Sequence, residues 1–416
     1  MWKRWRTRIL LFLAVLGPGF ITANVDNDSG GILTYSQAGA QFGYTLLWMM
    51  LPITIALIVV QEMCARMGVV TGKGLSDLIR EEFGLRLTVI LMVMLVVVNY
   101  TNVVTEFIGI AGSLHLFAIS RFVSVPLCAA LVWFMVVKGS YRSTEKIFLV
   151  ASVVYIAYIF AGVLSQPDWH DALLATITPP KHKVWSDKTY IYMAIGLVGT
   201  TIAPWMQFYL QSSIVEKGIR VKDYAASRLD VIVGSLFTDI VAWFIIVACA
   251  ATLFVHGMGA IQVAADAAEA MRPLAGNYAF LLFAFGLFNA SLFAASILPL
   301  STAYTVCEGL GVESGVDKSF REAPFFYWLY TLLIAGGAAT VLVLPDAQLI
   351  NFAILSQVLN GVLLPVIIIL MLMLINRKDL MGEHKNSRIW NWIAWGTSLI
   401  VIGMTLVMLW GMMPGH

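Results

Sequence analysis

The sequence predicts an all-helical integral membrane protein, and three observations support this fold class. Hydrophobic residues make up 60% of the 416 residues and charged residues only 12%, whereas soluble proteins carry roughly 25% charged residues. About eleven segments are apolar over the length that a membrane-spanning helix requires. Two of these segments, in corresponding places of the two halves of the chain, are interrupted by polar residues, glycine or proline.

The expected spans follow one another closely and leave no room for a soluble domain. They lie near residues 9–40, 45–67, 87–114, 122–138, 146–165, 189–215, 228–255, 277–306, 325–344, 348–375 and 390–412. We expect helices throughout, because an unpaired backbone is costly in lipid. Residues 71–82 have the pattern of a short amphipathic helix. A single transmembrane domain over 1–416 follows, with one half near 9–165, a second near 189–375 and an additional helix near 390–412.

The charge of the connecting loops predicts the orientation. Lys and Arg gather in alternate connections, such as 66–86 and 217–228, while the intervening ones, such as 257–277 and 345–348, carry few. Basic loops face the cytoplasm. We therefore expect a protein of the cell's inner (plasma) membrane with a cytoplasmic N-terminus and an extracytoplasmic C-terminus. The lipid bilayer is then a partner, while a net charge of +2 gives no indication of nucleic-acid binding.

The first interruption carries two carboxylates at membrane depth, Asp26 and Asp28, followed by Gly30 and Gly31. On a continuous helix the two aspartates would point about 200° apart, and one facing lipid would cost roughly 2.5–3.5 kcal/mol. In an extended segment they would share a side. We predict that the helix unwinds from Asp26 to Gly31 and turns both carboxylates toward one cavity. The alternative is that Asp28 or Ser29 caps the following half-helix.

The second interruption lies in the sixth span, at Pro204. Proline removes a helix hydrogen bond, so we expect a free carbonyl at Thr200, Thr201 or Ala203. Gln207 falls on the following half-helix. Helix breaks at matching points of two halves are typical of inverted-repeat secondary transporters, with the substrate bound at the breaks. Because the first break combines hard oxygen groups with no Lys or Arg in its span, it favours a cation such as Mg²⁺, Ca²⁺ or Mn²⁺.

Further polar residues at membrane depth leave two interpretations open. Asp239 in the seventh span is either a third carboxylate facing the cavity or a residue that packs helices together. Gln357 and Asn360 in the tenth span share a helix face, and they either hydrogen-bond to the site or join helices. Glu106 in the third span has a weaker claim to the site.

Several stretches of the chain resemble the Nramp divalent-metal transporters. The similar stretches are 17–20, 28–31, 37–44, 61–63, 66–75, 106–109 and 376–382, so the resemblance covers nearly the whole length. It implies a LeuT-like fold with two inverted five-helix repeats, interrupted helices 1 and 6, and an eleventh helix. It also implies transport of a divalent cation into the cell.

The chain departs from the family pattern at the places of two metal ligands. The family's first break is Asp-Pro-Gly-Asn; here Asp28 takes the Asp place, but Gly31 stands where the family has Asn. The second break of the family is Met-Pro-His, and here Ala203 replaces the Met. A thioether is a soft ligand that favours Mn²⁺, Fe²⁺ and heavier metals over Mg²⁺. A roomier, oxygen-lined site suits Mg²⁺, which usually keeps several of its waters.

Two further departures concern protons. Trp205 stands in the place of the family's His, and Val103 in the place of an Asp in the third span. Histidine has the pKa suited to proton relay, so its replacement predicts that proton coupling is not obligatory. These departures resemble the Nramp-related magnesium transporter branch.

The resulting expectation is a monomeric importer of Mg²⁺, and also of Mn²⁺, that works by alternating access. We expect neither an enzyme nor a cofactor, since no nucleophile–His pair lies at membrane depth. One alternative is a proton-coupled Mn²⁺ or Fe²⁺ transporter; another is a sodium-coupled organic-solute carrier, whose carboxylate substrate the aspartates would repel. The expected metal-site residues are Asp28, Ala203, Asp26, Gln207, Asp239, Gly31 and Gln357.

Overall fold

The computed structural model describes residues 17–138, 155–180, 187–257, 259, 261 and 264–411, and its regular structure there is entirely helical. Within these residues nine stretches are long and apolar enough to cross a membrane. The number is lower than the expected eleven for two reasons. Ser29–Thr71 joins part of the first expected span to the second, and much of the fifth lies outside the described residues.

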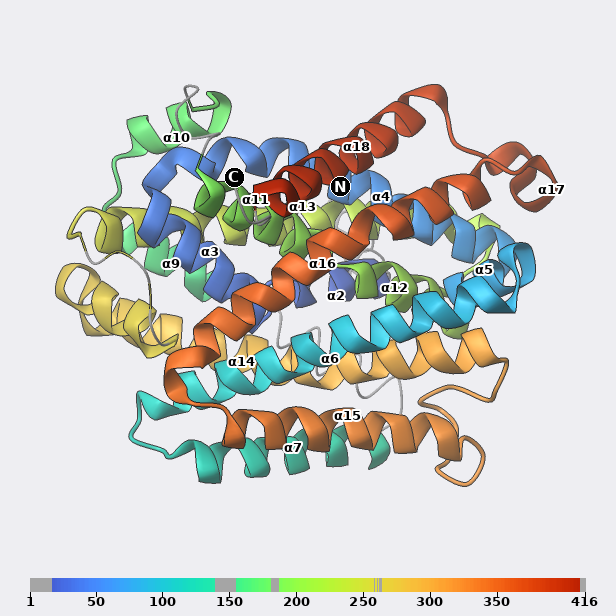
Figure 1. The fold of residues 1–416 in the computed structure, drawn as a ribbon, viewed down its shortest axis with the longest axis horizontal. Helices are drawn as coiled ribbons and strands as arrows, with labels where there is room; N and C mark the ends of the chain where they lie inside the picture. Colours follow the sequence, from blue (N-terminus) through green and yellow to red (C-terminus); the bar gives the residue numbers. More distant parts are fainter. Residues whose placement is uncertain are drawn as a thin grey trace, which may run out of the picture.

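The helices α6, α7, α14 and α15 run along the length of the molecule, and α3 and α16 cross them obliquely (Figure 1). Their bounds are α2 Pro18–Val25, α3 Ser29–Phe42, α4 Met50–Thr71, α5 Leu75–Phe83, α6 Leu85–His115, α7 Arg121–Lys138, α9 Ile156–Leu164, α10 Trp169–Ile177, α11 Lys188–Thr201, α12 Pro204–Glu216, α13 Tyr224–Cys249, α14 Ala264–Leu310, α15 Pro324–Val343, α16 Asp346–Ile375, α17 Lys378–Met381 and α18 Arg388–Gly411. The helix α5 confirms the predicted short amphipathic segment.

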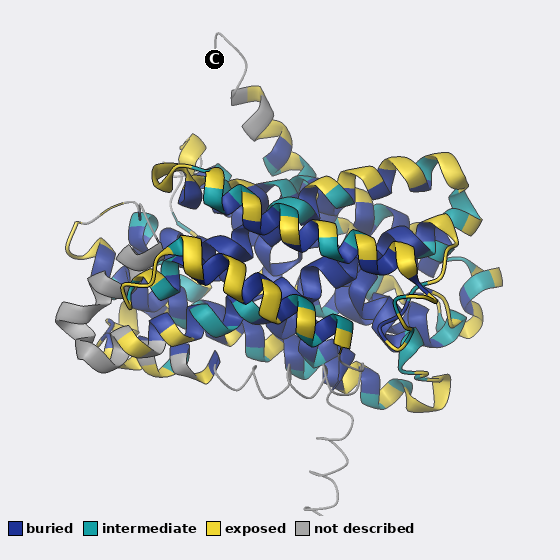
Figure 2. Cartoon of the chain, turned by 90° about the horizontal axis from the view of Figure 1, so that it is seen from below, coloured by how far each residue is buried: buried dark blue, intermediate teal, exposed yellow. Residues whose placement is uncertain are grey.

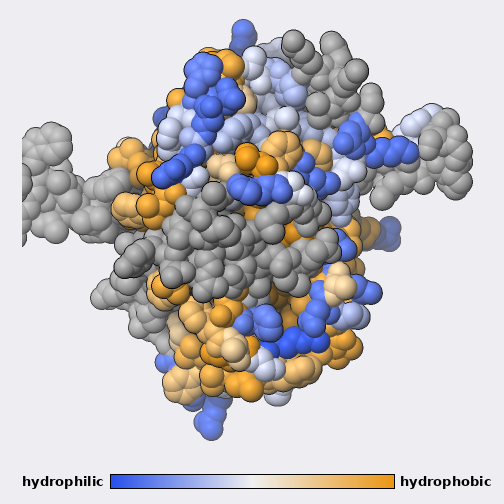
Figure 3. All heavy atoms as spheres, turned by 90° about the vertical axis from the view of Figure 1, so that its left-hand side faces the viewer, coloured by the Kyte–Doolittle hydropathy of each residue, from blue (hydrophilic) through white to orange (hydrophobic). Residues whose placement is uncertain are grey.

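The interrupted helices lie at the centre of the molecule and the others surround them. In an 18-residue stretch of the span Lys188–Glu216, 89% of residues are buried, against 22% in a stretch of the same length in Arg388–Val407 at the periphery. Figure 2 shows the same distribution, with buried residues inside and exposed stripes on the outer helices. Figure 3 looks at one end of the molecule, where hydrophobic residues gather toward the lower part and the margins and hydrophilic residues lie at the top and between them.

The first interruption is shorter than predicted. It covers only Asp26 to Asp28, and Gly30 and Gly31 already lie in the first turn of α3. The prediction of unwinding as far as Gly31 is therefore wrong. The reason is that Asp28 caps α3: its backbone is extended, and its carboxylate accepts a hydrogen bond from the Gly31 N–H at 2.7 Å. The capping alternative holds for Asp28 and not for Ser29.

The two glycines serve close packing. A methyl group on Gly30 would lie 2.8 Å from Cδ of Gln357, and one on Gly31 would overlap the carbonyl of Asp26. The α3 helix therefore approaches α16 and the end of α2 more closely than any residue with a side chain would allow.

The second interruption has the predicted place and cause. The helix α11 ends at Thr201 and α12 begins at Pro204, with Ile202 and Ala203 between them. Proline is well suited to the first position of a helix, where its missing N–H costs nothing. Ala203 before it is extended, with φ −66° and ψ 137°, as the residue preceding a proline prefers.

Candidate functional site

The two interruptions meet in the buried centre of the molecule. The hydroxyls of Tyr35 on α3 and Thr201 on α11 lie 2.8 Å apart in a hydrogen bond. A methyl group on Gly31 would lie 3.3 Å from the Thr200 hydroxyl, and the Gln357 carbonyl on α16 packs directly against Gly199 of α11. The structure thus brings Asp28, Gly31 and Gln357 together with the end of α11, as the matching breaks in the sequence predicted.

The Asp28 carboxylate faces α6. It lies within hydrogen-bonding reach of the Glu106 carboxyl group, while the Ser29 N–H donates to Glu106 Oε2 at 3.1 Å. The Ser29 hydroxyl donates to the carbonyl of Thr105 at 2.5 Å. Glu106 therefore lies beside the candidate site, although the sequence indicated only a weak case for it. Its charge at membrane depth was the signal, since such residues are functional by default.

Asp26 turns toward α13. Its backbone is helical, with φ −60° and ψ −31°, and among charged groups Asp239 acts on it more strongly than Asp28 does. The neighbouring Asn27 amide donates to the hydroxyl and carbonyl of Thr238, at 2.6 and 3.0 Å. The prediction of an extended segment is therefore wrong, because the backbone is helical at Asp26 and extended at Asp28. That the two carboxylates share one cavity stays a prediction.

The Ala203 carbonyl, expected to be free, is engaged by its own helix. It accepts a hydrogen bond from the Met206 N–H at 3.1 Å. With its amide oriented to satisfy the surrounding carbonyls, Gln207 also donates to the carbonyls of Ala203 and Pro204, both at 2.7 Å. Pro204 has no N–H, so the Thr200 carbonyl loses its ordinary helix donor.

Gln357 belongs to an amide network that joins α16 to α6, and it also contacts the site at Gly30. Its Nε2 donates to Asn102 Oδ1 at 3.3 Å and to the Ser356 hydroxyl at 3.0 Å. The Asn360 amide donates to Gln357 Oε1 at 2.9 Å and to Asn102 Oδ1 at 3.1 Å. Gln357 and Asn360 therefore join α16 to α6, and Gln357 also lies against Gly30 beside the candidate site.

The contacts of Asp230 on α13 and of Arg66 on α4 were not predicted from the sequence. Asp230 on α13 accepts hydrogen bonds from the first turn of α2. Arg66 on α4 bridges Glu62, at 3.0 Å, and Asn386. Asp230 could have been noticed as a carboxylate within a predicted span. Its hydrogen-bond partner Gly19 is 211 residues away in the chain, so the contact itself could not be predicted.

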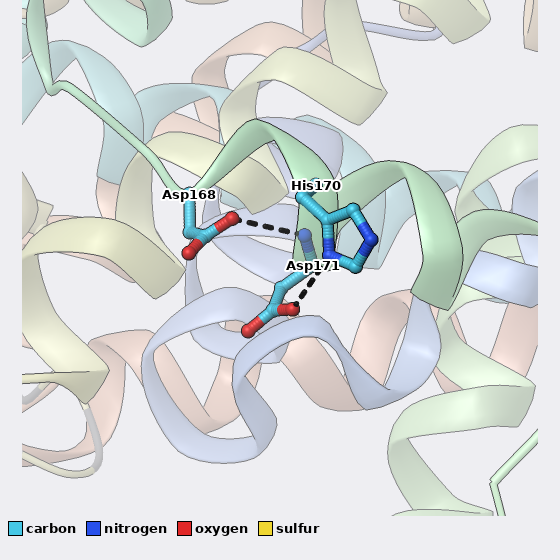
Figure 4. A group of neighbouring side chains, drawn as sticks. All are labelled: Asp168, His170 and Asp171. Carbon is cyan, nitrogen blue, oxygen red and sulfur yellow. Dashed lines mark hydrogen bonds and ion pairs between the residues drawn. The ribbon is translucent and has the colours of Figure 1, made fainter.

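A more obvious metal-like cluster lies at the surface. Within the described residues, Asp168, His170 and Asp171 are the one group of three such side chains whose ligand atoms all lie within 4.8 Å, and all three are exposed (Figure 4). Asp168 caps α10 by accepting from the Asp171 N–H at 3.0 Å. Local capping of α10 explains this geometry, and we assign the cluster no function.

The paired helix breaks in a buried, oxygen-rich centre define the class of protein as a multi-pass membrane transporter with inverted repeats. Residues 19–411 match the family model described as Natural resistance-associated macrophage protein-like, abbreviated Nramp. The chain therefore belongs to the Nramp family, which confirms the resemblance in the sequence.

Individual relatives and structures agree. The chain is 26% identical to the divalent metal cation transporter MntH of Granulibacter bethesdensis, with 98% of this chain and 89% of the relative covered. It is 28% identical to MntH of Nostoc sp., with 96% and 92% covered. The crystal structure of the Eremococcus coleocola manganese transporter matches with a TM-score of 0.76 at 23% identity, over 97% of this chain and 86% of that one. The LeuT-like fold is confirmed.

Proposed function

We propose that this protein imports divalent cations by alternating access, with Mg²⁺ as the principal substrate and Mn²⁺ as a second one. The curated relatives are divalent metal cation transporters. The observation that carries the choice of Mg²⁺ is Ala203 at the second break, where the family pattern has Met. Its methyl group leaves the backbone carbonyl as the only donor there, and an oxygen site favours hard ions.

Asp28 is the anchor of the proposed transport site. It presents a carboxylate between α3 and α6, and Gln357 approaches it from α16 beside Gly30. The Ala203 carbonyl reaches the ion once Gln207 releases it, and the Gln207 amide is then free to turn its own oxygen toward the ion. The small side chain at position 203 leaves more room for the waters that Mg²⁺ retains than a methionine would.

Proton coupling is not obligatory in this proposal. Trp205, in the place of the family's histidine, is buried and packs against Tyr209. Val103, in the place of an aspartate, is buried against Gly337. Membrane potential supplies a sufficient driving force, since a divalent ion crossing 100 mV gains about 4.6 kcal/mol, twice the figure for one charge.

A second candidate is a proton-coupled Mn²⁺ or Fe²⁺ transporter. The observation that favours it is the contact between the Asp28 and Glu106 carboxyl groups. Two carboxyl groups within hydrogen-bonding reach share a proton readily, and metal binding at Asp28 would then release it.

Proteoliposomes that contain a Mg²⁺ dye and a pH dye distinguish the two candidates. We expect Mg²⁺ uptake driven by an inside-negative potential, with no acidification of the interior, and loss of that uptake in Asp28→Asn. Strong Mn²⁺ uptake with acidification and no Mg²⁺ uptake would reject the proposal in favour of the second candidate.

We also propose the orientation that the basic loops indicate, with the N-terminus in the cytoplasm and the protein in the plasma membrane. Lys73, at the connection between α4 and α5, is half-exposed and lies on the proposed cytoplasmic side. A Lys73→Cys variant should resist a membrane-impermeant thiol reagent in whole cells and react after the membrane is opened. Labelling in intact cells would reverse the orientation.

A further inference from the structure

Asp26 and Asp239 carry buried carboxylates whose oxygens have no hydrogen-bond partner. Asp26 is 2% exposed and Asp239 is 4% exposed, and all four of their carboxylate oxygens are unpaired. The Thr54 hydroxyl, a polar neighbour of Asp239, donates instead to the carbonyl of Met50 at 2.7 Å. Buried charges are ordinarily paired or bound to a metal. Two buried and unpaired carboxylates therefore indicate a place where a cation binds.

Two neutral oxygens without hydrogen-bond partners belong to the helix break and to the end of α11. The Thr200 hydroxyl and Asn27 Oδ1 are buried and unpaired. A methyl group on Gly31 would touch both the Asp26 carbonyl and the Thr200 hydroxyl, so these two oxygens lie beside the same glycine. The charged groups that act on Asp26 are themselves acids, Asp239 and Asp28. A pair of carboxylates with hydroxyl and amide oxygens beside it is a donor set that divalent cations prefer.

This place is separable from Asp28. Asn27, next to Asp26, donates to Thr238 on α13, whereas Ser29, next to Asp28, donates to Thr105 and Glu106 on α6. The residues beside the two aspartates therefore contact different helices. The carboxylate oxygens of Asp26, Asp28 and Asp239 do not all lie within 4.8 Å of one another, so the three carboxylates are not gathered at one point.

We propose that Asp26 and Asp239 form a second divalent-cation position, on the α13 side of the helix break, that is occupied together with the Asp28 position. The proposal rests on the divalent-cation transport proposed above and adds a second ion to it. Two carboxylates match the charge of one divalent ion, and Thr200 and Asn27 supply neutral ligands. Waters complete the coordination of the ion.

The number of Mn²⁺ ions bound per chain tests this proposal. Titration of the full chain in detergent, with free Mn²⁺ measured by electron paramagnetic resonance, should give about two ions per chain. Asp239→Asn and Asp26→Asn should each bind about one, and Asp28→Asn should also bind about one, because a different position is lost in each case. Asp223→Asn is the matched control, since Asp223 lies at the exposed start of the same helix and the change should leave both ions bound.

Three results would overturn the second position: one ion per wild-type chain, two ions in Asp239→Asn, or loss of all binding in both Asp28→Asn and Asp239→Asn. A wild-type crystal soaked in Mn²⁺ gives an answer that does not depend on how the variants fold. Two anomalous peaks are expected, and a single peak at Asp28 would contradict the proposal. Failure of Mg²⁺ uptake in proteoliposomes, with two Mn²⁺ ions still bound, would reject only the proposed substrate.

Discussion

The Gly19 N–H of α2 donates a hydrogen bond to the Asp230 carboxylate of α13 at 2.8 Å. This bond joins the N-terminal end of α2 to the side of α13. The Gly17 and Phe20 N–H groups donate to the same carboxylate at 3.1 and 3.2 Å. The first N–H groups of a helix have no partner within it, so Asp230 acts as a cap supplied by another helix. A methyl group on Gly19 would lie 2.8 Å from Asp230 Oδ2, which leaves no room for a larger residue.

Asp230→Ala should destabilise the protein and reduce transport. The variant leaves the N–H groups of Gly17, Gly19 and Phe20 without their acceptor, and hydrogen bonds to charged groups are worth about 1.5–3 kcal/mol each. Asp230→Asn keeps one acceptor oxygen and should lose less. Thermal unfolding in detergent measures the effect, with exposed Asp223→Asn on the same helix as the control. An Asp230→Ala variant that melts like the wild type would show that the cap contributes nothing.

Gly31→Asn, which reinstates the family's residue, should not create an additional ligand. A side chain there overlaps the carbonyl of Asp26 and crowds Thr200, and overpacking of this kind costs roughly 1–3 kcal/mol. We expect a lower melting temperature and weaker Mg²⁺ binding in a calorimetric titration. Gly396→Ala is the control, because no atom lies within 4 Å of a methyl group at that position. Tighter Mg²⁺ binding in Gly31→Asn would contradict this account of the site.

The positions of both helix breaks could be predicted from the sequence, because their signals are local. Asp26, Asp28 and Pro204 are polar or helix-breaking residues within apolar spans, and the cost of burying them in lipid is a property of each residue alone. The family motifs supplied the fold for the same reason, since they consist of short contiguous stretches.

The direction of each side chain could not be predicted, because it depends on long-range contacts. The surroundings of Asp26 depend on the packing of the break against α13, where Asn27 donates to Thr238, 211 residues away in the chain. The extent of unwinding depended on whether the Asp28 carboxylate capped α3 or remained free, and the sequence allowed both. The engagement of the Ala203 carbonyl by Gln207 likewise follows from the rotamer of one side chain.

Arg66→Lys should weaken the junction between α4 and the segment before α18. The Arg66 guanidinium donates to Glu62, to Asn386 and to the carbonyls of His384 and Lys385, and it lies over the Trp390 ring, 6.0 Å from its centroid. A lysine cannot reproduce this planar fork. We expect a loss of about 1–3 kcal/mol, seen as a lower melting temperature. Exposed Arg220→Lys should have no effect, and equal melting of the two variants would refute the role of Arg66.

Ala203→Met should shift the ion preference away from Mg²⁺. Ala203 is 2% exposed and lies between α11 and α12, and its own carbonyl is the one proposed to bind the ion. A thioether placed there adds a soft ligand that favours Mn²⁺ and Cd²⁺, and it occupies volume that a hydrated Mg²⁺ needs. We expect Cd²⁺ to compete at roughly tenfold lower concentration, equivalent to about 1.4 kcal/mol, while Mg²⁺ uptake falls.

Ala203→Leu distinguishes the effect of the thioether sulfur from the effect of side-chain volume, because leucine and methionine are similar in size. It should reduce Mg²⁺ uptake as Ala203→Met does, but without any gain in Cd²⁺ competition. The measurement is inhibition of Mn²⁺ uptake by Cd²⁺ in proteoliposomes that carry each variant. If the two variants respond to Cd²⁺ alike, size alone decides the effect, and position 203 does not set the choice between hard and soft ions.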